Sequence, residues 1–280
     1  MLNPIRFIPW ALRLLGPVLV LVVLTLSCAT SPTGRRQLLL NSQPQMAEMG
    51  RRAFVQIKGE ISASTDASET AYVRCVANSI IRILSPRDLS GLAVNDWEVE
   101  LFQDDSANAF ALPGGRIGVH TGLLRIATTP AQLAAVLGHE VGHVLANHGN
   151  ARVSNSQLAQ SGVAVASIFL GGEDPEAQRE MMGYLGMGVQ LGVLMPFSRG
   201  DESEADQIGL ELMARAGFDP HASVTLWQKM GRASGSQAPP EFMSTHPSHS
   251  TRIGRLKAHM GRALPLYQQA QAAGRRPNCR

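Results

Sequence analysis

Hydrophobic and polar residues recur at helical spacing over most of this chain and at strand-like spacing in one central stretch. Residues 41–60 and 66–86 carry apolar positions about one turn apart, which predicts two helices. Alternation of apolar and polar residues over Trp97–Phe102 predicts a half-buried strand, and residues 110–112 and 117–119 continue the β region. The pattern therefore predicts an α+β chain that is mainly helical and has a small sheet.

A broadly apolar helix is predicted over residues 130–148. Thr129 can cap its start, Pro130 suits the first helical position, and Gln132 completes a capping box. Gly149 can end the helix. Because apolar residues occur on most sides of this helix, we expect it to be buried.

Three further helices are predicted in the last third of the chain. The helix that contains Glu202 should end just before Gly217, and the next should begin near Pro220. The last helix should span about 249–261, with a loose, Arg-rich tail from Ala272.

Residues 158–197 allow two interpretations. They contain two apolar stretches separated by Gly171–Pro175, and neither is long enough to span a bilayer. They can form two buried helices that pack on the apolar helix, or a pliable, Gly- and Met-rich lid or membrane-facing flap. Residues 231–240, rich in Gly, Ser, Gln and Pro, are predicted to form a loop.

The apolar helix contains the motif H-E-x-x-H at residues 139–143. Its two histidines, His139 and His143, are four residues apart and so lie on one face of the helix. Two neutral imidazoles in this position can bind one zinc ion, and Glu140 can act as general base toward an activated water. Polar groups inside a buried helix need partners, and a metal meets that need. The sequence therefore predicts one zinc ion per chain.

A catalytic zinc site needs a third protein ligand. Glu202 and Asp206 are one turn apart on a later predicted helix, so one can bind the metal while the other accepts a hydrogen bond from a ligand histidine. Glu204 points elsewhere on that helix. The same acids can also be a solvated helix start that the macrodipole favours, and charge alone does not decide between these readings.

H-E-V-G-H, followed some sixty residues later by E-S-E-A-D-Q-I-G, resembles the zinc peptidase family of HtpX and the CAAX prenyl proteases. The resemblance covers roughly residues 40–262. It implies a gluzincin-like zinc peptidase domain with a small β-sheet beside the active-site helix. It assigns His139, His143 and Glu202 as zinc ligands and Glu140 as the base, with Asp206 holding a ligand histidine.

Two further segments resemble elements of this family. The segment 108–124 resembles its edge strand beside the cleft, which implies that an extended peptide binds by β-augmentation. The substrate-binding residues that this implies are Asn108, Ala109, Phe110, Ala111 and Gly115. An ordinary hairpin is the alternative, since Pro113-Gly114-Gly115 is also a plain turn signal.

Thr245-His246-Pro247-Ser248 followed by Arg252 resembles the family's late His-Pro element. There His246 could approach the metal or the transition-state oxyanion, although a histidine before proline is also a common loop residue. His148, His249 and His259 are expected to be peripheral.

The N-terminus resembles a bacterial lipoprotein signal. Residues 1–27 combine basic residues with a short apolar stretch that is interrupted by a proline, and Cys28 follows directly. We expect residues 1–27 to be removed and Cys28 to be lipidated, with residues 28–40 as a linker; plain secretion and an uncleaved anchor are the alternatives. The expected domain then spans 41–262, with 263–280 as its tail. The residue after Cys28 is Ala29, which by resemblance to lipoprotein sorting suggests the outer membrane.

Charge and cysteine content refine this picture. Loss of residues 1–27 lowers the formal net charge from +3 to +1, and no basic patch indicates nucleic-acid binding. If Cys28 is lipidated, Cys75 and Cys279 are left, and in an oxidising compartment they can form a disulfide. Two separate thiols are the alternative.

These observations predict an exported, lipid-anchored zinc endopeptidase that cleaves misfolded or unassembled envelope proteins. Its partners are protein or peptide substrates and, through Cys28, a membrane. The oligomeric state does not follow from the sequence. Two rivals stand beside this prediction: a zinc-stabilised assembly or quality-control factor with little proteolysis, and a metal-dependent amidase that acts on the cell wall.

Overall fold

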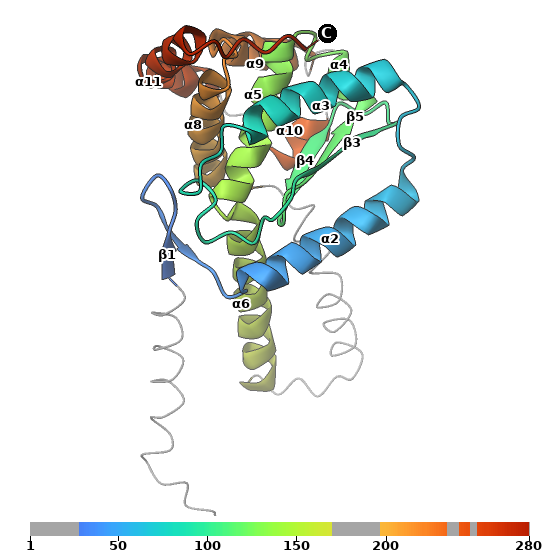
Figure 1. Cartoon of the computed structure of the whole chain (residues 1–280). Helices are drawn as coiled ribbons and strands as arrows, with labels where there is room; N and C mark the ends of the chain where they lie inside the picture. Colours follow the sequence, from blue (N-terminus) through green and yellow to red (C-terminus); the bar gives the residue numbers. More distant parts are fainter. Residues whose placement is uncertain (1–27, 170–196, 234–240, 247–250, 280) are drawn as a thin grey trace, which may run out of the picture.

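The computed structural model describes residues 28–169, 197–233, 241–246 and 251–279 (Figure 1). The expected signal peptide, residues 170–196 of the expected lid or core segment, and residues 234–240 of the expected loop lie outside the described residues. Within the described part of the chain, every helix is too short or too polar to cross a bilayer.

The described chain begins with a β-hairpin. Strand β1 (Cys28–Thr30) pairs antiparallel with β2 (Arg36–Leu38). Residues 28–40 therefore differ from the expected linker, because the hairpin packs onto the rest of the protein. The backbone N–H of Leu40 donates to Ser154 Oγ at 2.8 Å, and the Gln37 amide donates to the Ala146 carbonyl at 2.9 Å.

Two helices and a three-stranded sheet follow. Helix α2 (Gln43–Glu60) starts at a Ser42 capping box, and α3 (Ala67–Ile81) starts at an Asp66 cap. Strands β3 (Glu98–Phe102), β4 (Ala109–Leu112) and β5 (Arg116–His120) form the sheet in the order β3-β5-β4. Strand β5 lies parallel to β3 and antiparallel to β4, so β4 is an edge strand. The predicted mainly helical α+β architecture is confirmed.

The apolar helix α5 (Pro130–Leu145) follows the short helix α4 (Thr121–Leu124). Thr129 caps α5 as predicted, with its hydroxyl accepting from the Gln132 N–H at 3.2 Å. The predicted end at Gly149 is wrong. The α5 cap is Ala146, and Asn147 adopts a left-handed conformation with φ 57°, which a short polar side chain tolerates. A separate helix, α6 (His148–Phe169), begins directly after it.

The remaining described helices are α8 (Arg199–Arg215), α9 (His221–Ala233), α10 (Glu241–Thr245) and α11 (Arg252–Ala272). Gly217 follows the end of α8 with φ 93°, as predicted. The predicted end of the last helix at residue 261 is wrong, because α11 continues through Pro265 while Ala263 and Ala270 are buried. The chain after Ala272 is also held, since a disulfide joins Cys279 to Cys75 of α3.

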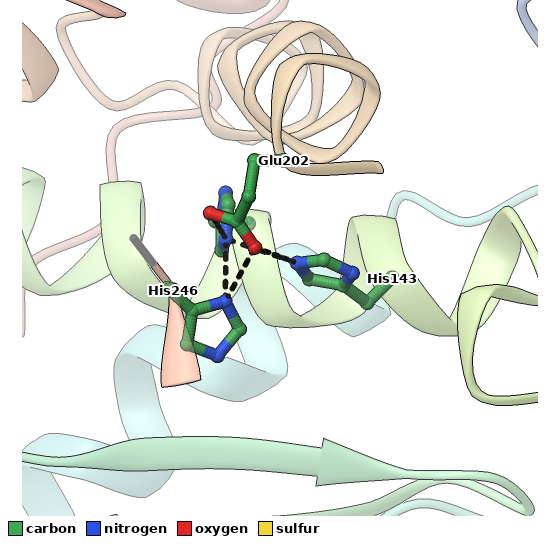
Figure 2. A group of neighbouring side chains, drawn as sticks. His143, Glu202 and His246 are labelled. Atoms are coloured by element: carbon green, nitrogen blue, oxygen red, sulfur yellow. Dashed lines mark hydrogen bonds and ion pairs between the residues drawn. The ribbon is translucent and has the colours of Figure 1, made fainter. Parts of the chain in front are cut away.

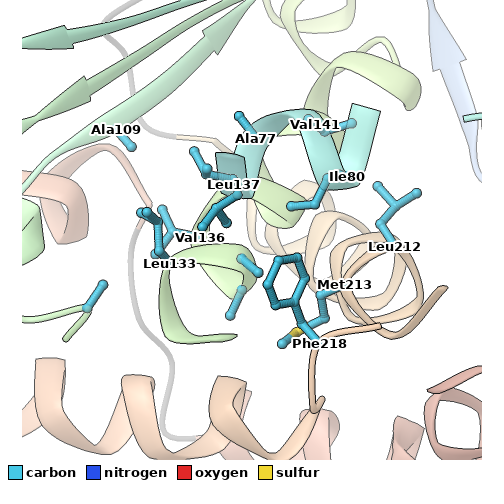
Figure 3. Packing of buried hydrophobic residues seen from close by; sticks show 14 of the residues in the cluster. Ala77, Ile80, Ala109, Leu133, Val136, Leu137, Val141, Leu212, Met213 and Phe218 are labelled. Carbon is cyan, nitrogen blue, oxygen red and sulfur yellow. The ribbon is translucent and has the colours of Figure 1, made fainter. Parts of the chain in front are cut away.

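Helix α5 is the centre of the core. Its apolar residues contact α3 and the sheet on one side and α8 and α9 on the other (Figure 3). Helices α5 and α8 approach closely at Gly138 and Gly209, because a Cβ atom on Gly209 would lie 2.6 Å from the His139 nitrogen. Two glycines at this crossing bring the polar residues of α8 within reach of the two histidines of α5.

Candidate active site

Four side chains, three from helices and one from the residue after a helix, converge beside α5. His139 and His143 come from α5, Glu202 from the first turns of α8, and His246 from the residue after α10. One donor atom of each lies within 4.8 Å of the others, and all four side chains are buried. In Figure 2, Glu202 reaches between His143 and His246.

The donor atoms of this cluster face one another directly. The two Nε2 atoms of His139 and His143 are 3.1 Å apart. Glu202 Oε1 lies 3.3 Å from His143 Nε2 and 2.9 Å from His246 Nδ1. The predicted residues His139, His143 and Glu202 are therefore brought together, and His246 joins them.

Asp206 and Arg252 hold the far side of His139. His139 Nδ1 lies 3.0 Å from Asp206 Oδ1, so we assign the ring proton to Nδ1, which leaves the Nε2 lone pair free. Arg252 donates to Asp206 Oδ1 and to Glu202 Oε2, the latter at 3.0 Å, and its guanidinium lies over the ring of Trp227. Arg252 Nη2 also lies 3.1 Å from His139 Nδ1, but its bond to the charged Asp206 oxygen is shorter.

A second chain of hydrogen bonds holds the far side of His143. His143 Nδ1 lies 2.9 Å from His148 Nδ1, and His148 Nε2 lies 3.2 Å from Glu204 Oε2. The prediction that His148 is peripheral is wrong, since its side chain is fully buried. Helical spacing could not place His148, because the chain leaves the helix at Asn147 between the two histidines.

Burial and charge set the protonation of these groups. Burial lowers the pKa of both His139 and His143 well below the usual value, which favours the neutral rings that bind metals. Burial alone would raise the pKa of Glu202, but His139, His246 and Arg252 outweigh it and lower that pKa to about 2. Burial raises the pKa of Asp206 to about 6 despite the opposing charge of Arg252.

Glu140 stands next to the cluster on the side of the sheet. Its Oε2 accepts a hydrogen bond from the Ala111 N–H of edge strand β4 at 3.2 Å. Its Oε1 is buried and has no hydrogen-bond partner among the residues that the structure describes, although His246 Nε2 lies 3.4 Å away. Burial raises the pKa of Glu140 to about 7. A carboxylate held in this way can accept a proton from a reactant near neutral pH.

These residues fit a bound metal ion. With both ring protons on Nδ1, two imidazole lone pairs and a carboxylate oxygen point at one another across about 3 Å, an arrangement that repels unless a cation lies between them. Two histidines and one carboxylate form a donor set that zinc binds in peptidases.

The predicted substrate-binding residues occupy different places. Ala111 lies on the unpaired edge of β4 beside Glu140, and Asn108, just before the strand, and Ala109, its first residue, are buried. The Phe110 ring packs against Phe54 and Phe102, and Phe110 lies opposite Gly118 of β5. Gly115 belongs to the turn after β4, where its carbonyl accepts from the Glu98 N–H.

A cavity of about 550 Å³ adjoins the cluster. It reaches from His143 and Ala111 to α2 and the start of α6, and the Phe197 ring stacks on His143 at its edge. Its lining is mostly apolar and includes Met46, Met49, Ala53, Ile57, Leu112 and Val153. Apolar side chains can therefore be accommodated next to the donor cluster.

The profile of peptidase family M48 matches residues 67–260, a span that contains the H-E-x-x-H motif, Glu202 and His246. The chain belongs to peptidase family M48. M48 peptidases use zinc, so the donor cluster is a site able to bind zinc, as predicted. The family resemblance read from the motifs is likewise confirmed.

Several curated proteins are similar to this M48 member. Mitochondrial metalloendopeptidase OMA1 of Schizosaccharomyces pombe is 34% identical over 219 residues, which cover 78% of this chain and 61% of that protein. The beta-barrel assembly-enhancing protease of Escherichia coli strain K12 is 29% identical over 231 residues, 81% of this chain and 46% of that protein. The human mitochondrial metalloendopeptidase OMA1 is 30% identical over 248 residues, 84% and 46% of the two chains. This chain thus spans roughly half the length of its relatives.

Proposed function

We propose that this protein is a zinc-dependent endopeptidase of the bacterial cell envelope that cleaves misfolded or unassembled proteins. The observation that carries the proposal is the position of Glu140, which lies between the donor cluster and the backbone of an edge strand. A zinc site that only stabilised the fold would not need a buried carboxylate with a free oxygen there.

His139, His143 and Glu202 are the residues that would hold the zinc. Bound zinc would supply a Lewis acid and would lower the pKa of an attacking water. Glu140 would take the proton from that water and pass it to the leaving amine. Asp206 and Arg252 keep the His139 ring in the orientation that exposes its Nε2 lone pair.

The edge strand supports a polypeptide as substrate. One side of β4 pairs with β5, and the other side presents backbone groups toward Glu140. An extended peptide could add to this edge, with its carbonyl near the cluster and its apolar side chains in the adjoining cavity. Exposed apolar side chains are a property of unfolded and unassembled proteins, which favours them over cell-wall glycopeptides.

The location is proposed from the N-terminus. Cys28 would carry the lipid after removal of residues 1–27, and the protein would face the periplasm from the outer membrane. The Cys75–Cys279 disulfide supports an oxidising compartment. The Escherichia coli relative is named as a protease that enhances β-barrel assembly, which supports the envelope, although other relatives are named as mitochondrial.

A second candidate function rests on His246. Catalytic zinc sites keep one position open, whereas structural sites are closed by four protein ligands. His246 supplies a fourth donor inside the cluster. This favours, as the alternative, a zinc-stabilised assembly or quality-control factor with little proteolysis.

The test compares the full chain with Glu140→Gln, using casein and purified peptidoglycan as substrates and measuring bound zinc in both proteins. We expect one zinc in each and casein cleavage by the unmodified protein only. Zinc in both with cleavage by neither would favour the alternative function. Release of muropeptides without casein cleavage would overturn the peptidase proposal.

A further inference from the structure

The N-terminal hairpin reaches the buried chain of hydrogen bonds behind His143. Thr33, in the turn between β1 and β2, donates from its hydroxyl to Glu204 Oε1 at 2.6 Å. Arg35 donates to Glu204 Oε2 at 2.9 Å and pairs with Asp201 Oδ1 at 2.9 Å. Glu204 is the residue that bonds His148. The hairpin is therefore separated from the metal-facing ring of His143 by only two side chains.

Each hydrogen bond in this chain has a defined donor and acceptor. Glu204 can only accept, so His148 donates to it from Nε2–H. In a neutral His148, Nδ1 is then an acceptor, and the 2.9 Å contact requires His143 to donate from Nδ1–H. That tautomer of His143 leaves Nε2 unprotonated and aimed at His139 and Glu202.

The hairpin supplies the hydrogen-bond partners that the buried carboxylate of Glu204 needs in order to hold His148. Its side chain is 1% exposed, and an isolated buried carboxylate is costly. The hairpin thus supplies a hydroxyl and a guanidinium as hydrogen-bond donors to this carboxylate behind His148.

Gly200 and Gln37 support the contact between the hairpin and the helices around His143. A Cβ atom on Gly200 would lie 2.9 Å from Arg35 Nη2, so a glycine at this position lets the guanidinium approach the start of α8. Gln37 bonds the Ala146 carbonyl at the end of α5, the helix that carries His143. Figure 1 shows the hairpin beside the junction of α5 and α6.

We propose that the β1–β2 hairpin is part of the metal site: Thr33 and Arg35 hold Glu204, Glu204 holds His148, and His148 positions His143 for the metal. His148, Glu204, Thr33 and Arg35 are positioning residues, since each acts through His143. The inference rests on the proposed function, because it takes His143 as a zinc ligand. The hairpin starts at Cys28, so the segment that we propose to carry the lipid anchor is also the segment that completes the site.

The test measures the zinc dissociation constant of the full chain by competition with a chromophoric chelator, and the visible spectrum of the cobalt-substituted protein. His148→Leu removes the acceptor for His143, and we expect about 10–100-fold weaker zinc binding and a changed cobalt spectrum. His148→Asn keeps an amide oxygen near the position of Nδ1, and we expect it to retain most of the affinity.

Two hairpin variants keep the test decisive if His148→Leu fails to fold. Thr33→Val removes only the hydroxyl, and Arg35→Gln removes the cation from a side chain that is 40% exposed. We expect each to weaken zinc binding by about 3–10-fold, which is less than the effect of His148→Leu, because solvent screens the hairpin contacts. Arg36→Gln, the same kind of change at an exposed neighbour, is the matched control and should bind zinc normally.

The outcomes separate this inference from the proposed function. If Thr33→Val and Arg35→Gln match Arg36→Gln in zinc affinity and cobalt spectrum, while His143→Ala loses zinc, the inference is overturned and the proposed function stands. If His143→Ala binds zinc as tightly as the unmodified protein, both are overturned.

Discussion

The crossing of α5 and α8 gives the sharpest prediction for the site. Gly209 of α8 lies against the backbone at Gly138 and His139, and Gly209→Ala would place a methyl group in that contact. We expect this single carbon to push the two helices apart, lower stability and weaken zinc binding, although it lies two turns along α8 from Glu202.

The size of the effect follows from the distances. The new Cβ atom would lie 2.6 Å from the His139 nitrogen and 2.7 Å from the Gly138 carbonyl carbon. Nonbonded heavy atoms pack at about 3.5 Å, so α8 must move by roughly 1 Å. Overpacking of this kind costs about 1–3 kcal/mol. Metal ligands tolerate displacements of only about 0.2 Å, so zinc affinity should fall as well.

Gly261→Ala in α11 is the matched control. A Cβ atom on Gly261 would meet nothing within 4 Å. Both changes gain up to about 1 kcal/mol of helix propensity, which cancels when the two variants are compared. The remaining difference is the overpacking cost, which corresponds to roughly 2–12 °C between their unfolding midpoints for a protein of this size.

The assay is thermal unfolding followed by circular dichroism, together with a zinc dissociation constant for each variant. Equal midpoints and equal zinc affinities for Gly209→Ala and Gly261→Ala would refute the reasoning, since they would mean that α5 and α8 do not depend on their close approach. Loss of stability with unchanged zinc affinity would refute only the link between the crossing and the metal site.

Three further predictions concern acid stability, the disulfide and the metal. Asp88 accepts hydrogen bonds from Arg215 and Ser85, which outweigh partial burial and lower its pKa to about 2 from 3.8. The stability that this provides is present above pH 4 and is lost as the pH falls from about 4 to 2. Asp88→Asn should therefore cost about 1 kcal/mol at pH 7 and flatten the plot of urea midpoint against pH between pH 4 and 2, and an unchanged plot would contradict the prediction. Because the Cys75–Cys279 disulfide closes a separation of 204 residues, Cys279→Ser should lower the free energy of unfolding by about 2–4 kcal/mol, and equal alkylated masses with and without reductant would show that the bond is absent. Removal of zinc by a chelator should lower the unfolding midpoint reversibly, because zinc at about 100 times its dissociation constant adds about 2.7 kcal/mol to the free energy of unfolding. A midpoint insensitive to zinc would contradict metal binding to the folded state.

Local signals in the sequence predicted some helix boundaries, whereas others depend on tertiary packing. The capping residue Thr129 and the glycine at 217 act through their nearest neighbours, so both could be read directly. The end of α5 and the length of α11 depend on wider context. Asn147, not the predicted Gly149, takes the left-handed conformation after α5, and Pro265 is accommodated in a helix in which Ala263 and Ala270 are buried.

Some residues of the candidate site could likewise be predicted from local spacing, and others depend on tertiary packing. His139, Glu140 and His143 could be found because one helical turn sets their spacing, and family resemblance added Glu202 and Asp206. Arg252 was noted in the sequence without a role, and its contact with both acids follows only from the packing of α11 on α8. His148 and Arg35 were missed because a helix break and a hairpin, neither visible in hydrophobic periodicity, bring them to Glu204.

Three buried acids of α8 explain how one helix serves both histidines of α5. Glu202 and Asp206 are one turn apart and face His139, whereas Glu204, two residues from each, faces His148 and the hairpin. All three carboxylates are buried, and each has an arginine within hydrogen-bond reach: Arg252 for Glu202 and Asp206, and Arg35 for Glu204. Helix α8 is therefore held on two faces by cations from the two ends of the chain. Because both chains of hydrogen bonds pass through α8, a displacement of that helix disturbs His139 and His143 together, whereas loss of the hairpin contacts disturbs His143 alone.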